Sequence, residues 1–182
     1  MSAFRRTDLA SVMLVPERAD EIARRSQDID YRGFHRYHLT FCTDFRKPFF
    51  VDATSVTLVA HQIQRAADQT RFTIVAYCFM PDHVHLVIEG TRDDSDCLRF
   101  VKLAKQMSGF SFSKARGEKL WQRYGFEHVL RDDELTLVVV RYVLQNPVRA
   151  GLASDPRQYP FIGSQIYSVA DLLDAIADVQ ST

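Results

Sequence analysis

In the segment AYCFMPDHVHLVIEG, residues 76–90, two apolar runs meet at Pro81 and Asp82. Both runs are rich in the β-branched and aromatic residues that favour strands, and the Pro-Asp pair favours a turn. The segment therefore predicts an antiparallel hairpin. Its second run contains His83 and His85, and side chains two residues apart in a strand point to the same face. The sequence thus predicts two imidazoles side by side on a buried strand.

Strand and helix signals alternate on both sides of this hairpin. The alternating run at 37–43 predicts a strand, and apolar residues at helical spacing predict a helix over 52–70. Further helices are predicted at 94–116 and 132–146, with a short strand at 126–131 between them. This order of elements is typical of an α+β domain. It favours a ferredoxin-like or RRM-like antiparallel sheet with packed helices.

The composition is that of a soluble globular protein. The chain has 182 residues, of which 46% are hydrophobic and 25% charged. No apolar run approaches the roughly 18 to 20 residues that cross a bilayer, so we expect no membrane association. No signal peptide is evident, and the expected location is the cytoplasm. The three cysteines form no pattern typical of a zinc site or a disulfide framework.

Charge is unevenly distributed along a chain whose formal net charge is zero. From Arg99 to Arg149 there are ten Lys or Arg and five Asp or Glu, whereas residues 51–98 carry three basic and seven acidic side chains. Cations on a helix face in the basic segment could hold a DNA backbone. A solvated helix face would explain the same cations equally well. The candidates are Arg99, Lys102, Lys105, Lys114, Arg116 and Lys119.

The paired histidines have two explanations. Two imidazoles on one strand face suit a single divalent metal ion. Alternatively, each ring could bind a stray backbone carbonyl or lie at the sheet edge. The apolar surroundings indicate that His83 and His85 need partners, because a buried polar group without one costs about 1 to 3 kcal/mol.

A second group of polar side chains lies in VVVRYVLQNPVRAGL, residues 138–152. Tyr142 and Asn146 are four residues apart, which makes them neighbours on one face of a helix. A phenol can act as a nucleophile, and an amide oxygen can complete a metal site. The alternative is a tyrosine that packs in the core, followed by an ordinary Asn-Pro helix stop. The sequence does not identify a base for the phenol proton.

Three blocks of the chain carry a family resemblance. They are CFMPDHVHLVIEG at 78–90, LWQRYGFEHVLRDD at 120–133 and RYVLQNPVRAGL at 141–152. In this order and spacing they resemble the single-tyrosine transposases of the HUH endonuclease superfamily, which are insertion-sequence-200-like, and most closely the REP-associated tyrosine transposases. The resemblance covers 34–161, the expected nuclease domain. Residues 1–33 would be an N-terminal arm and 162–182 a C-terminal tail with an amphipathic helix. The tail lacks the serine pair that the family often has.

The resemblance implies a metal-dependent enzyme that nicks and joins single-stranded DNA through a 5′-phosphotyrosine. His83 and His85 would bind Mg2+ or Mn2+, and Asn146 falls at the position of the third metal ligand. Tyr142 would be the nucleophile. The implied partner is a DNA hairpin of the REP or palindromic-repeat kind. The REP-associated branch is expected to act as a monomer, whereas a dimer with an exchanged tyrosine helix is the arrangement of the insertion-sequence relatives.

Two other functions stay open from the sequence. A non-catalytic nucleic-acid-binding module on an RRM-like sheet would need neither the metal nor Tyr142. A small metal-dependent hydrolase could use the two histidines on another substrate, but the chain lacks the additional His, Asp or Glu pattern that such enzymes normally require.

Overall fold

The computed structural model describes residues 31–123, 126–130 and 133–178. The chain divides into two units between Asp30 and Tyr31, and the account below concerns the second unit. This unit begins three residues before the expected start of the nuclease domain. The rest of the predicted N-terminal arm lies outside the described residues.

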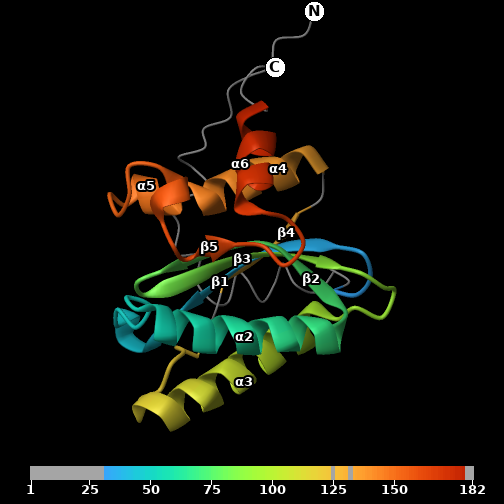
Figure 1. Ribbon diagram of the computed structural model, residues 1–182. Coiled ribbons are helices and arrows are strands. Elements are labelled where there is room, and N and C mark those ends of the chain that lie inside the picture. Colours follow the sequence, from blue (N-terminus) through green and yellow to red (C-terminus); the bar gives the residue numbers. More distant parts are fainter. Residues whose placement is uncertain (1–30, 124–125, 131–132, 179–182) are drawn as a thin grey trace, which may run out of the picture. The chain divides into compact units, whose positions relative to one another are not determined.

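A five-stranded antiparallel sheet with the strand order β4-β1-β3-β2-β5 forms the centre of this unit (Figure 1). Strands β1 and β2 lie on either side of β3, and the chain crosses between them through a helix. The order 4-1-3-2 of the first four strands is that of the ferredoxin-like fold, so the predicted fold class is confirmed. The strands are β1 (Arg36–Cys42), β2 (Phe72–Met80), β3 (His83–Gly90), β4 (Phe126–Leu130) and β5 (Ile162–Gly163).

The predicted hairpin is present as β2 and β3. Met80 pairs with His83, which leaves Pro81 and Asp82 as a two-residue turn. Both strands are buried over most of their length, as their apolar sequences predict. The turn and the start of β3 therefore hold the two histidines in a rigid position on the sheet.

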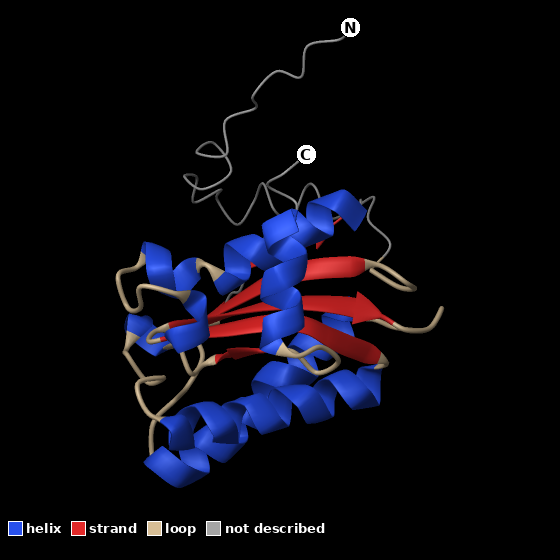
Figure 2. Cartoon of the chain, turned by 45° about the horizontal axis from the view of Figure 1, so that its top comes forward, coloured by secondary structure: helices blue, strands red, loops and turns tan. Residues whose placement is uncertain are grey.

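Helices cover both faces of the sheet, with α2 and α3 on one face and α4 and α6 on the other (Figures 1 and 2). Asp52 caps α2 by accepting a hydrogen bond from the Ser55 amide at 2.8 Å, whereas the sequence allows either Asp52 or Thr54 as the cap. Asp96 caps α3 in the same way through Arg99. The helices are α2 (Ala53–Thr70), α3 (Cys97–Arg116), α4 (Asp133–Leu144), α5 (Asn146–Arg149) and α6 (Val169–Asp178), with short 3-10 turns η2 (Asp44–Arg46) and η3 (Pro156–Gln158).

Side chains alternate along a strand, so one face of β1 is apolar and the other is polar. Tyr37, Leu39 and Phe41 are fully buried in the apolar layer beneath α2 and α3. His38 and Thr40 point to the opposite face, toward α4. The polar face of the sheet is thus supported by a large aromatic core behind it.

The segment predicted as a C-terminal tail contributes to the second apolar layer. Strand β5 pairs with β2, and α6 packs against α4. The buried side chains of this layer include Ala76, Cys78, Val140, Val143, Leu144, Ile162, Leu172, Leu173 and Ile176. The described residues include no helix with the length and apolar character that crossing a membrane requires.

The close approach of two backbones at Gly90 gives a stability prediction. A Cβ at Gly90 would overlap the carbonyl oxygen of Gly33, whereas a Cβ at Gly109 would make an ordinary contact, 3.5 Å from Trp121. Gly90→Ala should lower the free energy of unfolding by about 1 to 3 kcal/mol, as overpacking does. Gly109→Ala, in the middle of α3, should leave it unchanged or raise it by up to about 1 kcal/mol. Urea unfolding followed by circular dichroism measures both, and equal stability of the two variants would contradict the prediction.

Candidate active site

The candidate site lies where β1 and β3 pair, on the face of the sheet that α4 covers. The register places Thr40 opposite His85 and Cys42 opposite His83. Directly opposed residues of antiparallel strands share a face, so the polar side chains of both strands gather there. His38, two residues before Thr40, joins them.

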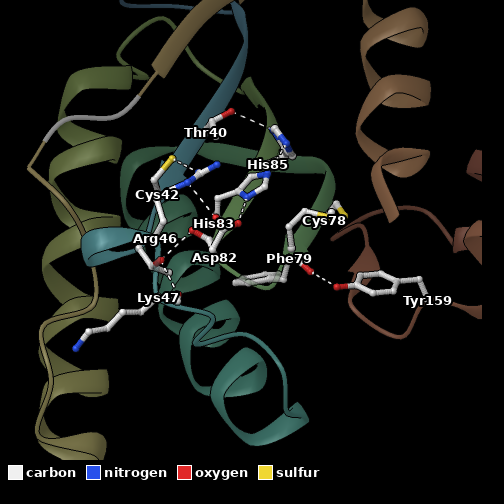
Figure 3. A network of polar contacts seen from close by, with 12 residues as sticks. Thr40, Cys42, Arg46, Lys47, Cys78, Phe79, Asp82, His83, His85 and Tyr159 are labelled. Carbon is white, nitrogen blue, oxygen red and sulfur yellow. Dashed lines mark hydrogen bonds and ion pairs between the residues drawn. The ribbon is translucent and has the colours of Figure 1, made fainter. Parts of the chain in front are cut away.

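His83 and His85 lie side by side, as the strand geometry predicts. Their Nε2 atoms are 3.1 Å apart, and their ring planes are inclined at 86° (Figure 3). His85 is 6% exposed, so it is more deeply buried than an imidazole at a sheet edge would be. The two rings direct one nitrogen each at a common point.

The ring of His83 is oriented by the turn that precedes it. Asp82 Oδ1 accepts a hydrogen bond from His83 Nδ1 at 2.6 Å, and Asp82 Oδ2 forms an ion pair with Arg46 Nε at 2.9 Å (Figure 3). Because Nδ1 carries the proton, Nε2 of the neutral ring presents its lone pair. A carboxylate behind a histidine in this way is the usual arrangement of a metal-binding imidazole.

The ring of His85 is held from the other side by β1. Its Nδ1 lies 3.0 Å from Thr40 Oγ1 and 3.2 Å from His38 Nε2. Burial lowers the pKa of His85 well below the ordinary histidine value, and the neighbouring His38 and His83 lower it further. Burial also lowers the pKa of His83, against the opposing effect of Asp82. Both rings are therefore neutral near pH 7, which is the form that binds metals.

The donor set fits a divalent cation. Adjacent ligands at about 2.0 to 2.1 Å from one ion, in tetrahedral or octahedral geometry, lie about 2.8 to 3.4 Å from each other. The Nε2 separation of 3.1 Å falls within this range. Within the described ranges, no group of three or more His, Cys, Asp or Glu side chains could hold a metal. Among the described residues, a further protein ligand would therefore be an amide oxygen, and water or substrate oxygens would fill the other positions.

Tyr142 lies against these histidines within the same chain. Its ring makes edge contacts with His38 and His85, at centroid distances of 5.9 and 5.8 Å. The guanidinium carbon of Arg149 lies 4.0 Å from the centroid of the Tyr142 ring. Helix α4 thus brings a half-buried phenol, flanked by a cation, to the histidine pair.

Asn146 is buried and makes its hydrogen bonds within the α4–α5 segment. Its Nδ2 donates to the carbonyl of Tyr142 at 2.9 Å, and its Oδ1 accepts from Arg149 Nη2 at 3.2 Å. Across the described parts of the chain, Asn146 has no hydrogen bond to either histidine. In this structure its side chain connects the backbone of the tyrosine to Arg149. Its function as a metal ligand stays a prediction.

The predicted DNA-binding cations lie mainly on α3, across the sheet from α4 (Figure 1). Arg99, Lys102 and Lys114 are exposed, and Lys105 donates to the carbonyl of Gln122 at 2.8 Å. Two other cations reach the β1–α2 connection, where Arg116 pairs with Asp52 and Lys119 with Asp44. The structure does not bring the α3 face to the histidine pair, and DNA binding by these residues stays a prediction.

Sequence reasoning missed several residues of the site. His38 and Thr40 could have been found, because the alternation in YHLTFCT places them on the face opposite Tyr37, Leu39 and Phe41. What the alternation does not reveal is that β1 is the neighbour of β3. Three residues outside β1 were also missed, namely Arg46, Asp82 and Arg149.

Comparison with known families agrees with this geometry. Residues 34–146 match the family model described as "Transposase IS200 like", which spans both histidines and Tyr142. The chain belongs to the IS200-like transposase family. As a family member, it is similar to a Haemophilus influenzae protein named as a REP-associated tyrosine transposase, with 31% identity over 101 residues, or 50% of this chain and 57% of that protein.

A second curated relative and a solved structure are also similar to this member of the IS200-like transposase family. The REP-associated tyrosine transposase of Escherichia coli K12 is 28% identical over 110 residues, covering 59% of this chain and 64% of that protein. The chain thus spans about three fifths of the length of the curated relatives that it matches. A solved REP-associated tyrosine transposase bound to a REP hairpin has 22% identity, covers 75% of this chain and 81% of its own, and has a TM-score of 0.63. The two proteins therefore share a fold.

Access to the site can be tested through the cysteines. Cys42 lies opposite His83 and is partly exposed, whereas Cys78 and Cys97 are buried, and burial raises the pKa of the Cys78 thiol to about 12. The thiolate is the reactive form. Dithionitrobenzoate at pH 8 should therefore modify Cys42 alone in the folded protein and all three thiols in urea. Absorbance and peptide mass spectrometry measure this, with Cys42→Ser as the control. Rapid modification of Cys78 in the folded protein would contradict the structure.

Proposed function

We propose that this IS200-like transposase nicks and joins single-stranded DNA in a metal-dependent reaction through a covalent link to Tyr142. The observation that carries the proposal is the contact of Tyr142 with His85, which belongs to a pair of neutral imidazoles whose Nε2 atoms are 3.1 Å apart. Membership of a transposase family supports this assignment. A tyrosine that served only to pack the core would not need to contact two histidines and an arginine.

His83 and His85 would hold the cation, and the oxygen donors preferred by Mg2+ and Mn2+ would come from Asn146, water and the substrate. When bound, the cation polarises the scissile phosphate and stabilises the charge that develops there. Asp82 and Thr40 orient the two rings. For Asn146 to be the third ligand, its Oδ1 must face the cation as well as, or instead of, Arg149.

The proposed chemistry is an exchange of one phosphate ester for another. The Tyr142 oxygen attacks the phosphorus and loses its proton, and the bond from phosphorus to the 3′ oxygen breaks. That oxygen takes up a proton and leaves as a 3′-hydroxyl, while the 5′ end stays on the tyrosine. Attack by a second 3′-hydroxyl reverses the step and joins two ends without ATP. Arg149, which stacks on the Tyr142 ring, carries a charge that suits the phosphate.

The proposed substrate is a hairpin of the REP or palindromic-repeat kind with a single-stranded flank. Two relatives are named as REP-associated, and a protein of the same fold was solved with a REP hairpin. We further propose a cytoplasmic monomer that uses its own tyrosine, because Tyr142 contacts His85 of the same chain.

The nucleophile can be tested by trapping the covalent adduct. Wild-type protein, Mn2+ and a hairpin substrate labelled on the 3′ side of the nick should give a band that migrates as protein plus DNA in denaturing gels. Tyr142→Phe should abolish this band because no phenol oxygen remains. Tyr167→Phe should retain it, because Tyr167 is an exposed residue in the loop before α6. An equal amount of adduct from Tyr142→Phe would show that the nucleophile is elsewhere. Hairpin binding without any adduct from the wild type would favour the non-catalytic module.

The metal site can be tested by Mn2+ titration calorimetry without DNA. His85→Ala should remove the binding isotherm, and Asp82→Asn should weaken affinity by about 10- to 100-fold, as loss of a supporting carboxylate does. His61→Ala, an exposed histidine on α2, should bind as the wild type does. Circular dichroism checks that each variant is folded. Unchanged Mn2+ affinity in folded His85→Ala would rule out the assigned ligands.

A further inference from the structure

The connection between β1 and α2 displays the most exposed large apolar side chain in the described part of the chain. Phe45 is 86% exposed, compared with 71% for Phe110 on α3. An isolated exposed aromatic needs no explanation by itself. The backbone at Phe45 provides a second observation.

Phe45 and Arg46 both adopt the left-handed region, with φ of 53° and 56°. This conformation is costly for residues with a Cβ and is uncommon outside Gly, Asn and Asp. Phe45 therefore combines an unfavourable backbone conformation with an apolar ring in water. A glycine or asparagine would relieve both costs, so folding does not explain the phenylalanine. Such outliers are concentrated at functional sites.

The loop that carries Phe45 is firmly held on both sides. Thr43 Oγ1 donates to the carbonyls of Lys47 and Asp82, at 2.8 and 2.9 Å, and the Asp44 amide donates to the carbonyl of Leu120 at 2.7 Å. The ring is therefore presented from a fixed backbone. Binding to such a surface requires little additional ordering of the chain.

Phe45 is connected to the histidine pair through its neighbour. Arg46 pairs with Asp82, and Asp82 bonds to His83 (Figure 3). Arg46 also donates to Cys42 Sγ at 2.8 Å, on the strand opposite His83. The loop therefore forms one border of the candidate active site.

The surroundings of the ring suit a phosphate backbone. Lys47 pairs with Glu118, and the side chains of this pair are 49% and 46% exposed. Such exposed ion pairs contribute little stability, so a phosphate can replace the Glu118 carboxylate at low cost. Lys119 pairs with Asp44, and its side chain is 68% exposed although that of Asp44 is only 17% exposed. The two ammonium groups are thus accessible to a charged strand that passes Phe45.

We propose that Phe45 is a stacking platform for one base of the single-stranded DNA that leads to His83 and His85. Bases stack on aromatic side chains in proteins that bind single strands, and cations track the backbone beside them. The inference rests on the proposed function, because the proposed active site is the point toward which the DNA strand would run. It adds a substrate-positioning residue that makes no contact with the scissile phosphate.

A binding measurement tests the platform. Fluorescence anisotropy of a labelled single-stranded oligonucleotide, without divalent metal, compares the wild type with Phe45→Asn, Phe45→Trp and Phe110→Ser. Phe45→Asn should weaken binding by about 5- to 100-fold, as loss of a stacking aromatic does. Phe45→Trp should retain wild-type affinity, and Phe110→Ser, across the sheet from α4, should be unaffected. Urea unfolding should show Phe45→Asn to be as stable as the wild type or more stable. Weaker DNA binding by this variant would then come from the lost ring contact and not from unfolding.

Photo-crosslinking and adduct formation complete the test. An oligonucleotide with 5-iododeoxyuridine should crosslink to Phe45, as peptide mass spectrometry would show. If the wild type forms an adduct while folded Phe45→Asn binds and reacts equally well, the platform is overturned and the proposed function stands. If Phe45→Asn weakens DNA binding but the wild type never forms an adduct, the platform stands and the proposed chemistry fails. Unchanged affinity together with crosslinks only elsewhere would likewise overturn the platform.

Discussion

The antiparallel pairing of β1 with β3 is the constraint on which the candidate site depends. This register sets Thr40 opposite His85 and Cys42 opposite His83, and it brings His38 within 3.2 Å of His85. A slip of one residue would turn the polar side chains of β1 into the aromatic layer and expose its apolar side chains. The large apolar side chains at 37, 39 and 41 therefore do more than fill the core, because their burial selects the register that assembles the polar face.

The polar face combines groups that are costly to bury with partners that reduce this cost. His85 is nearly inaccessible to solvent, yet both of its nitrogens have polar neighbours from β1 or β3. His83 has the carboxylate of Asp82 behind it, and that carboxylate has Arg46. Neutral rings held in fixed orientations are prepared for a cation before it arrives, which is a form of preorganisation.

Local features of this fold could be predicted from the sequence, whereas features that depend on distant pairing could not. The Pro81-Asp82 turn and the helix over 52–70 are determined by neighbouring residues, and the structure has both, with α2 at Ala53–Thr70. His38 was missed because its importance depends on which strand lies beside β3. The helical spacing of Tyr142 and Asn146 correctly made them neighbours, but α4 ends at Leu144, so the Asn146 amide bonds to the tyrosine's backbone. Periodicity likewise revealed a basic face on α3, but not the side of the sheet on which α3 packs.

The sheet also separates two demands that proteins often have to meet in the same place. Most of the large aromatic side chains of the core lie beneath α2 and α3, whereas the histidines and the tyrosine lie on the other face. Activity commonly limits stability because functional side chains occupy positions that packing would fill better. Here the strands separate the two layers. The layer beneath α2 and α3 can therefore accumulate stabilising substitutions while the histidines and the tyrosine on the opposite face stay unchanged. Within this architecture, divergence of α2 and α3 is compatible with conservation of the reactive face.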